Sequence, residues 1–231
     1  MVLNPTPNIA TRQVIAIDGP AGAGKSTVAK KLAKILNISY LDTGAMYRAL
    51  TLKALREKIP LENEDALVDL TGRTTIDFEN HPSGGKVILD GQDVSQEIRS
   101  LDVTNNTFYI ARAPRVRSIM VNWQRQIAGK QGVVADGRDV GTVIFPQATF
   151  KFYLDADLEE RVKRRLRELK EKGQNVDSAV LLKEMSERDE QDFTRKVGPL
   201  KKADDAIFID STYFSVDETV AEILKKMKSH G

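Results

Sequence analysis

Gly19-Pro20-Ala21-Gly22-Ala23-Gly24-Lys25-Ser26 is the stretch that decides the fold of this 231-residue chain. It fits the pattern G-x-x-x-x-G-K-[ST], a loop whose backbone N–H groups surround phosphates. An apolar run at residues 14–17 precedes it like a buried strand. Apolar residues follow it at helical spacing, namely Val28, Leu32, Ile35 and Leu36. A loop between a strand and a helix uses the helix N-terminus to attract an anion. We therefore expect a nucleoside triphosphate site; the alternative is a glycine-rich turn that binds nothing.

The composition narrows the class of protein. Formal net charge is +2, from 35 basic and 33 acidic residues, which gives no reason to expect a nucleic-acid polymer as partner. The absence of cysteine excludes disulfides, thiolate metal sites and a cysteine nucleophile. No apolar run is long enough to span a bilayer. Residues 1–12 are polar and contain proline, without the apolar segment of a signal peptide. We expect a disordered tail there and a cytoplasmic protein.

Strand-like and helical patterns alternate along the rest of the chain. Further short apolar runs suggest strands at residues 38–41, 133–136, 149–154 and 206–209. Helical patterns fall at residues 45–58, 62–70, 101–111, 114–128, 157–173 and 177–190, with Ser215 and Glu218 capping a last helix. This order predicts a parallel sheet with helices on both faces. Residues 74–94 read instead as a small antiparallel insert, with His81-Pro82-Ser83-Gly84-Gly85 and Asp90-Gly91 as turns. We expect one α/β domain.

A triphosphate loop is shared by small-molecule kinases, GTPase switches and motor ATPases. The guanine-reading N-K-x-D of the switches is absent, and the chain has no second long ATPase core. Arginines on short loops suit phosphoryl transfer, which depends on positioning and on cations around the moving group. The residues favour a kinase for a small acceptor.

Two loops that follow strands carry candidate site residues. Asp136-Gly137-Arg138-Asp139 puts a carboxylate and a guanidinium at the carboxyl edge of the sheet, where ligands of such sheets bind. Asp136 could hold Mg²⁺ through water, together with the Ser26 hydroxyl, while Lys25 reaches the β- and γ-phosphates. The alternative is a turn with a structural ion pair. Asp42-Thr43-Gly44-Ala45-Met46-Tyr47-Arg48 offers a helix cap and, one turn on, an arginine for an acceptor phosphate.

Two charged helices admit two interpretations each. Residues 159–172 carry Arg161, Lys163, Arg164, Arg165 and Arg167, with acidic residues at i,i+4 spacing. From spacing alone a solvated face is favoured over a mobile lid that brings arginines over the phosphates. Arg188, Asp192 and Arg195 form one stripe, either functional or a surface salt-bridge ladder. His81 and His230 offer nothing catalytic.

Together these segments resemble the bacterial cytidylate kinases. The resemblance rests on the phosphate loop, residues 42–48, Pro114-Arg115-Val116-Arg117, the run from Asp136-Gly137-Arg138-Asp139 to Pro146, Glu187-Arg188-Asp189 and Asp210-Ser211-Thr212. It covers about residues 14–227 and implies a five-stranded parallel sheet of the P-loop NTPase type. It also implies a core (about 13–60, 129–156 and 196–231), a nucleoside-monophosphate lobe (about 61–128) and a helical lid (about 157–195). The implied reaction is transfer of the γ-phosphoryl group of ATP to CMP or dCMP with Mg²⁺, by direct in-line attack.

The resemblance also assigns roles by position. ATP would be held by Gly19, Pro20, Ala21, Gly22, Ala23, Gly24, Lys25, Ser26, Thr27 and the lid residue Arg164. The acceptor phosphate would be held by Thr43, Arg48, Arg138 and Arg195, its sugar by Arg188 and Asp192, and cytosine by Arg117 and Asp139. Lys25, Arg138, Arg161, Arg165 and Arg188 would be catalytic, and Ser26 and Asp136 would serve the metal. The implied partners are these small molecules, with no nucleic-acid polymer and no membrane, and we expect a monomer.

The base assignment has a physical reason. Cytosine presents an amino donor beside ring acceptors, so a carboxylate and a guanidinium can pair with it together, whereas uracil would set a carbonyl against Asp139. Phe108 stands where many relatives carry a serine that touches the base. Either its ring lines the pocket, or Thr107 or Tyr109 substitutes. The rival functions are a kinase for UMP or another small acceptor, and a nucleotide-dependent binding module.

Overall fold

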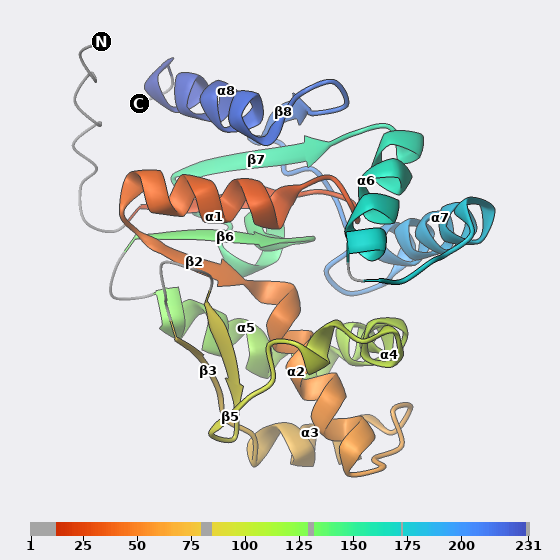
Figure 1. The fold of residues 1–231 in the computed structure, drawn as a ribbon. Helices are drawn as coiled ribbons and strands as arrows, with labels where there is room; N and C mark the ends of the chain where they lie inside the picture. The colour runs from red at the N-terminus through yellow and green to blue at the C-terminus, as the bar shows by residue number, and fades with distance from the viewer. Residues whose placement is uncertain (1–12, 80–84, 129–131, 172, 230–231) are drawn as a thin grey trace.

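The central sheet has five parallel strands in the order β2-β6-β1-β7-β8, as the resemblance implied (Figure 1). Their bounds are Val14–Asp18 (β1), Ser39–Asp42 (β2), Val133–Gly137 (β6), Phe150–Asp155 (β7) and Ile207–Asp210 (β8). Asp18 lies opposite Gly137, Asp42 opposite Asp136, and Asp155 opposite Asp210. Because parallel strands end at the same edge, the carboxylates predicted to follow separate strands come together there.

This computed structural model describes residues 13–79, 85–128, 132–171 and 173–229. The expected tail at residues 1–12, the turn at residues 81–84 with its histidine, and His230 lie outside the described residues.

Side chains alternate along the strands between two apolar clusters. Ile15, Ile17 and Phe152 pack with α1 (Lys25–Leu36) and α8 (Val216–Ser229) on one face. Ala16, Leu41 and Ala135 face the other cluster, which includes residues of α2 (Thr43–Arg56) and α5 (Pro114–Ala128). Figure 1 shows these two pairs of helices on opposite sides of the sheet. Helices on both faces are therefore confirmed. Ile35 is a small departure, because 38% of its surface is exposed.

The predicted insert is a three-stranded antiparallel sheet, β3 (Ile76–Glu79), β4 (Lys86–Leu89) and β5 (Gln92–Asp93). Asp90 and Gly91 form its second turn with φ angles of 49° and 82°, the left-handed pair that closes a tight hairpin. Its apolar residues join the same cluster as α2, α3 (Glu64–Gly72) and α4 (Leu101–Arg112). The insert is thus packed against a helical lobe below the sheet.

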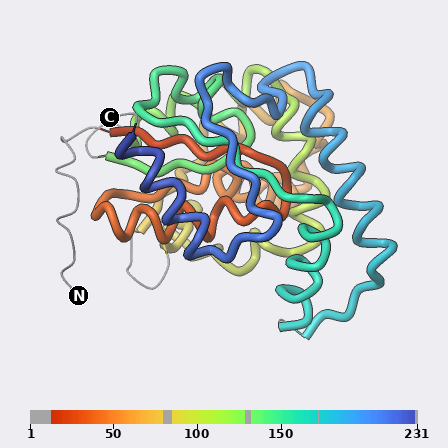
Figure 2. The backbone as a smooth tube through the Cα atoms, turned by 90° about the horizontal axis from the view of Figure 1, so that it is seen from above, coloured from red at the N-terminus to blue at the C-terminus, as the bar shows by residue number. Residues whose placement is uncertain are grey.

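Two helices, α6 (Leu158–Glu171) and α7 (Ser178–Thr194), pack on each other through a cluster of their own. Its buried members are Val162, Leu169, Leu181 and Met185. Figures 1 and 2 both show the α6–α7 pair at one side of the molecule. The second helix runs four residues beyond the predicted end. None of the helices that the structure describes is long and apolar enough to cross a membrane.

Two short segments had no counterpart in the sequence prediction. The 3₁₀-helix η1 (Glu97–Arg99) precedes α4, and the π-helix η2 (Val140–Ile144) follows β6. The π-helix begins directly after Asp139, so it shapes the loop that carries two of the predicted site residues.

Candidate active site

The phosphate loop has the backbone that its glycines permit. Gly24, with φ 87°, is the N-cap of α1, and a left-handed N-cap favours glycine. Gly19 lies against β7, where an added Cβ would come within 3.0 Å of the Leu154 carbonyl carbon. The loop can therefore pass close to the neighbouring strand and open directly into the helix.

Lys25 lies buried beneath the loop. Its Nζ donates to the Pro20 carbonyl over 2.6 Å. Burial, and then the positive charge of Arg138, lower the pKa of Lys25 to about 7. In the free protein, the nearby carboxylates do not offset the burial of its positive charge. The negative charge of bound phosphates would therefore stabilise the ammonium form.

Ser26 and Asp136 lie side by side, as the metal prediction requires. The Ser26 hydroxyl donates to Asp136 Oδ2 over 2.8 Å, and the Tyr40 hydroxyl donates to Oδ1 over 2.7 Å. Burial, and then the charge of Asp42, raise the pKa of Asp136. Hydroxyl and carboxylate oxygens are ligands that Mg²⁺ prefers, so this donor set fits the ion. Tyr40 was not predicted, because only strand register brings it to Asp136.

Asp42 is the N-cap of α2, and Arg48 of that helix lies beside it. Asp42 Oδ1 accepts from the Ala45 N–H over 2.8 Å, which confirms the predicted cap, and Oδ2 accepts from Arg48 over 3.0 Å. Thr43 donates to the Asp136 carbonyl over 2.7 Å. Arg48 Nε is buried without a hydrogen-bond partner among the described residues. The segment therefore keeps unused hydrogen-bonding capacity at the sheet edge.

Arginines from separate segments gather around Arg188 of α7, and one of them, Arg138, also lies near Lys25. Burial, and then the charges of Arg138, Arg48 and Arg165, lower the pKa of Arg188 to about 10. Asp192 is a carboxylate within this group, accepting from Arg138 Nε over 2.6 Å and lying 3.8 Å from Arg195. Such an excess of half-buried cations is costly, and an anionic ligand would relieve the cost.

Arg117 and Asp139, the predicted cytosine readers, form a buried ion pair. Arg195 lies 3.5 Å from the same carboxylate, and the Tyr47 ring lies under the Arg117 guanidinium, 5.5 Å from its centroid. Burial raises the pKa of Asp139, and the two guanidiniums oppose that rise. In the free protein the two readers therefore satisfy each other.

Gly198 covers this ion pair and was missed in the sequence. Its φ is 56°, and an added Cβ would come within 2.8 Å of the Arg117 guanidinium carbon and closer still to Asp139. The Gly198 carbonyl accepts from Arg195. A larger residue would displace the readers, so this glycine belongs to the site.

The charged residues of α6 lie in two different environments, one buried and one exposed. Arg161 is buried and donates to Asp189 over 2.6 Å, to the Ala21 carbonyl over 2.9 Å and to the Ala156 carbonyl over 2.9 Å. The solvated-face interpretation is therefore wrong for Arg161, and its carboxylate partner Asp189 was not predicted. Arg167 is exposed and pairs with Glu160, as a solvated face would have it.

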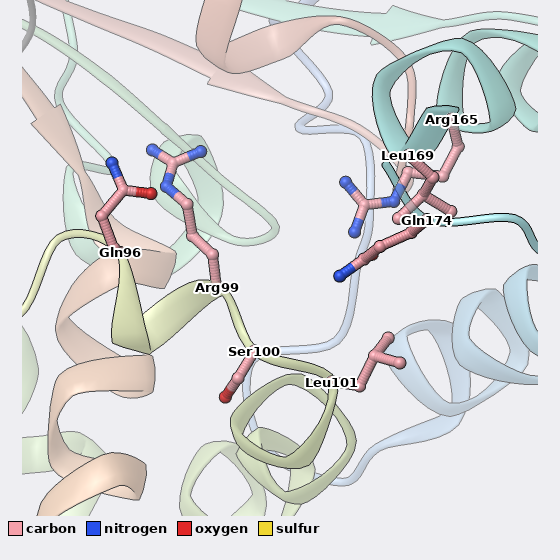
Figure 3. A pocket seen from close by; sticks show the side chains of 7 residues that line it. All are labelled: Gln96, Arg99, Ser100, Leu101, Arg165, Leu169 and Gln174. Atoms are coloured by element: carbon pink, nitrogen blue, oxygen red, sulfur yellow. The ribbon is translucent and has the colours of Figure 1, made fainter. Parts of the chain in front are cut away.

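The other two lid arginines point to different places. Arg164 donates to the Ser211 carbonyl over 2.6 Å, so it lies on the loop after β8. Arg165 lines a cavity of about 300 Å³ between α6 and the start of α4. Figure 3 shows Arg165 and Arg99 extending into this space from opposite walls. The cavity separates the α6–α7 pair from the helical lobe.

Phe108 lies half-buried on α4 in an aromatic group. Its ring meets Tyr109 edge-on with centroids 6.1 Å apart, and the Arg112 guanidinium lies over both rings. The Thr107 hydroxyl donates to the Val103 carbonyl over 2.6 Å. The Thr107 hydroxyl therefore donates its hydrogen bond within α4 in the free protein.

Comparison with known proteins agrees with this geometry. The family model described as cytidylate kinase matches residues 15–229. The chain is 53% identical over 212 residues to the cytidylate kinase of Desulforamulus reducens, covering 91% of this chain and 94% of that protein. It is 49% identical to the cytidylate kinase of Caldanaerobacter subterraneus subsp. tengcongensis, covering 94% and 95%. A solved structure of an uncharacterized protein from Eubacterium ventriosum is similar in fold, with 18% identity, a TM-score of 0.52 and coverage of 94% and 99%.

Proposed function

The chain belongs to the cytidylate kinase family, and on this basis we propose that it transfers the γ-phosphoryl group of ATP to CMP or dCMP. The observation that carries the proposal is the gathering of Arg48, Arg138 and Arg165 around Arg188, with Arg138 also near enough to Lys25 of the phosphate loop to lower its pKa. Phosphoryl transfer is catalysed mainly by positioning and by fixed positive charge. A nucleotide-dependent binding module would have no need of so many cations around a second subsite.

The donor half of the proposal uses the loop and its neighbours. The loop amides, Lys25, Thr27 and Arg164 bind ATP, and the phosphates restore the charged form of Lys25. Mg²⁺ would be held by Ser26 and, through water, by Asp136, whose oxygens already lie together. When bound, the ion neutralises charge on the donor phosphates.

The acceptor half uses the arginine cluster and the buried ion pair. Thr43, Arg48, Arg138 and Arg195 hold the acceptor phosphate, while Arg188 and Asp192 hold the sugar. Cytosine enters between Arg117 and Asp139 and replaces the contact that these two make with each other in the free protein. Its amino group donates a hydrogen bond to the carboxylate, and its ring acceptors accept hydrogen bonds from the guanidinium. Uracil would leave the buried carboxylate facing a carbonyl oxygen, which disfavours UMP.

Transfer then needs no covalent intermediate. An oxygen of the acceptor phosphate attacks the γ-phosphorus in line as the bond to the β–γ bridging oxygen breaks, and ADP leaves with that oxygen. Lys25, Arg138, Arg161, Arg165 and Arg188 stabilise the charge that spreads over the transferred group. The α6–α7 pair acts as a lid, closing the cavity in front of Arg165 and excluding water. We propose further that the chain works as a monomer in the cytoplasm, since one chain supplies the whole site.

The test is ADP release from Mg·ATP with CMP, dCMP, UMP, AMP, GMP or no acceptor. We expect turnover with the two cytidine nucleotides and little with the others. Comparable turnover with UMP would replace the proposal by a general pyrimidine kinase. ATP binding without acceptor-dependent turnover would support the binding module instead.

A further inference from the structure

Asp18 is a buried carboxylate that the proposed chemistry does not use. It ends β1, directly before Gly19, and only 4% of its surface is exposed. Its two oxygens accept from consecutive backbone N–H groups, Val140 N over 2.8 Å and Gly141 N over 2.7 Å. One side chain thus joins the end of β1 to two residues that follow it by 122 and 123 positions in the sequence.

The two segments that it joins belong to different halves of the site. Gly19 begins the phosphate loop, which holds the donor. Val140 and Gly141 begin the π-helix η2, directly after Arg138 and Asp139 of the acceptor half. The backbone strands already lie side by side, with Asp18 opposite Gly137, but strand pairing ends there. Beyond the strands, the carboxylate continues the attachment.

The atoms around these two hydrogen bonds are closely packed. A Cβ at Gly141 would lie 3.3 Å from Asp18 Oδ2 and 3.2 Å from the Lys151 side chain. A Cβ at Gly137 would lie 2.7 Å from Val140 Cγ2. Gly141 therefore lets the segment approach Asp18 of β1 closely, and Gly137 leaves room for the Val140 side chain before Arg138 and Asp139. The position of the segment is thus closely defined.

Keeping a carboxylate here is unfavourable for stability. Burial is the main cause that raises the pKa of Asp18 to about 6; the two N–H groups oppose the rise, and the charge of Asp139 adds to it. Carboxylates held against such a cost are concentrated at functional sites.

We propose that Asp18 is a positioning residue, which holds the turn bearing Arg138 and Asp139 at a set distance from the phosphate loop. It thereby aligns the acceptor with the γ-phosphate and keeps the Asp139 carboxylate directed at the base. The inference rests on the proposed kinase function. It assigns Asp18 no contact with either substrate.

The test compares Asp18→Asn with the wild-type enzyme, using CMP and UMP as acceptors. The amide keeps one acceptor oxygen and sets an N–H₂ group against the second backbone N–H, so the turn shifts. We expect kcat/KM for CMP to fall about 10- to 100-fold and ATP affinity to stay within about threefold, since small misplacements cost this much. The ratio of CMP to UMP turnover should fall as well.

A merely structural role would lower the melting temperature and leave the base preference unchanged. Ile223→Val, on the buried face of α8, is the matched control for lost stability. Gly141→Ala is a second variant, which keeps Asp18 but places a methyl group against its carboxylate. It should lower kcat/KM for CMP and the CMP/UMP ratio in the same direction, by smaller factors. An unchanged CMP/UMP ratio and KM for CMP in folded Asp18→Asn or Gly141→Ala would overturn the proposal. If wild-type protein shows no CMP-dependent turnover, the proposed function fails instead.

Discussion

The donor and acceptor halves of this site are built in opposite ways. The donor half is built mainly on one contiguous stretch, Gly19 to Thr27, which runs from the end of β1 into the first turn of α1, with Arg164 and Asp136 added from elsewhere. The acceptor half draws single residues from α2, α5, the loop after β6 and the end of α7. A contiguous loop depends on local backbone geometry, whereas a dispersed site depends on the whole fold. Disturbing the first should lower turnover strongly with every acceptor, and disturbing the second should change which acceptor is used.

Lys25→Met should have the largest effect. Loss of the cation over the β- and γ-phosphates should lower kcat by about 10²- to 10³-fold for every acceptor, as for other single charge-stabilising groups. The fold should be retained, because a buried ammonium with a lowered pKa is replaced by an apolar side chain. Steady-state kinetics with CMP and dCMP, together with thermal unfolding, would check this. A loss confined to one acceptor would contradict the division into halves.

Asp139→Asn should come next and should act on the base. The amide can donate to the uracil carbonyl, so kcat/KM for CMP should fall about 10²-fold and that for UMP should change little or rise. Competition assays with mixed CMP and UMP would measure the ratio directly. Equal losses for both acceptors would show that Asp139 does not read the base.

Gly198→Ala should give a smaller effect. The added methyl group displaces Arg117 and Asp139, so KM for CMP should rise about tenfold while KM for ATP stays the same. Gly91→Ala is the matched control, since Gly91 also has a positive φ and an added Cβ there meets no described atom within 4 Å. The control should lose stability, about 1 kcal/mol, without a change in either KM.

Proton uptake on ATP binding should be the smallest signal. Lys25 titrates near pH 7 in the free protein, so at pH 8 most molecules carry it neutral. Bound phosphates favour its charged form and raise its pKa, and binding at pH 8 should therefore take up a fraction of a proton. Calorimetry in two buffers of different ionisation enthalpy would measure the uptake. The same uptake in Lys25→Met would assign it to another group.

The sequence predicted the fold better than the site. The five core strands are contiguous apolar runs, so each was placed to within a residue or two. The π-helix at residues 140–144 was not predicted, since Val-Gly-Thr-Val-Ile has no helical periodicity. From spacing alone, Arg161 was expected on a solvated face, and only the resemblance gave it a role in the site, because i,i+4 spacing cannot reveal a partner 28 residues away, Asp189. Asp18, Tyr40 and Gly198 acquire their contacts only through strand register and loop packing, which leave no local pattern.

The α6–α7 pair has one further consequence, which follows from its separate apolar cluster. Among the residues that the structure describes, four buried side chains and a few partly buried ones hold the two helices to each other. Detachment of the pair as a unit leaves that cluster intact and exposes little new apolar surface. The heat-capacity change of such an opening is small, and its free energy hardly depends on urea, because both quantities follow the area exposed. In hydrogen exchange, amides whose protection depends on docking of the pair should therefore exchange by a route that urea does not accelerate, unlike the amides of β1 and β6.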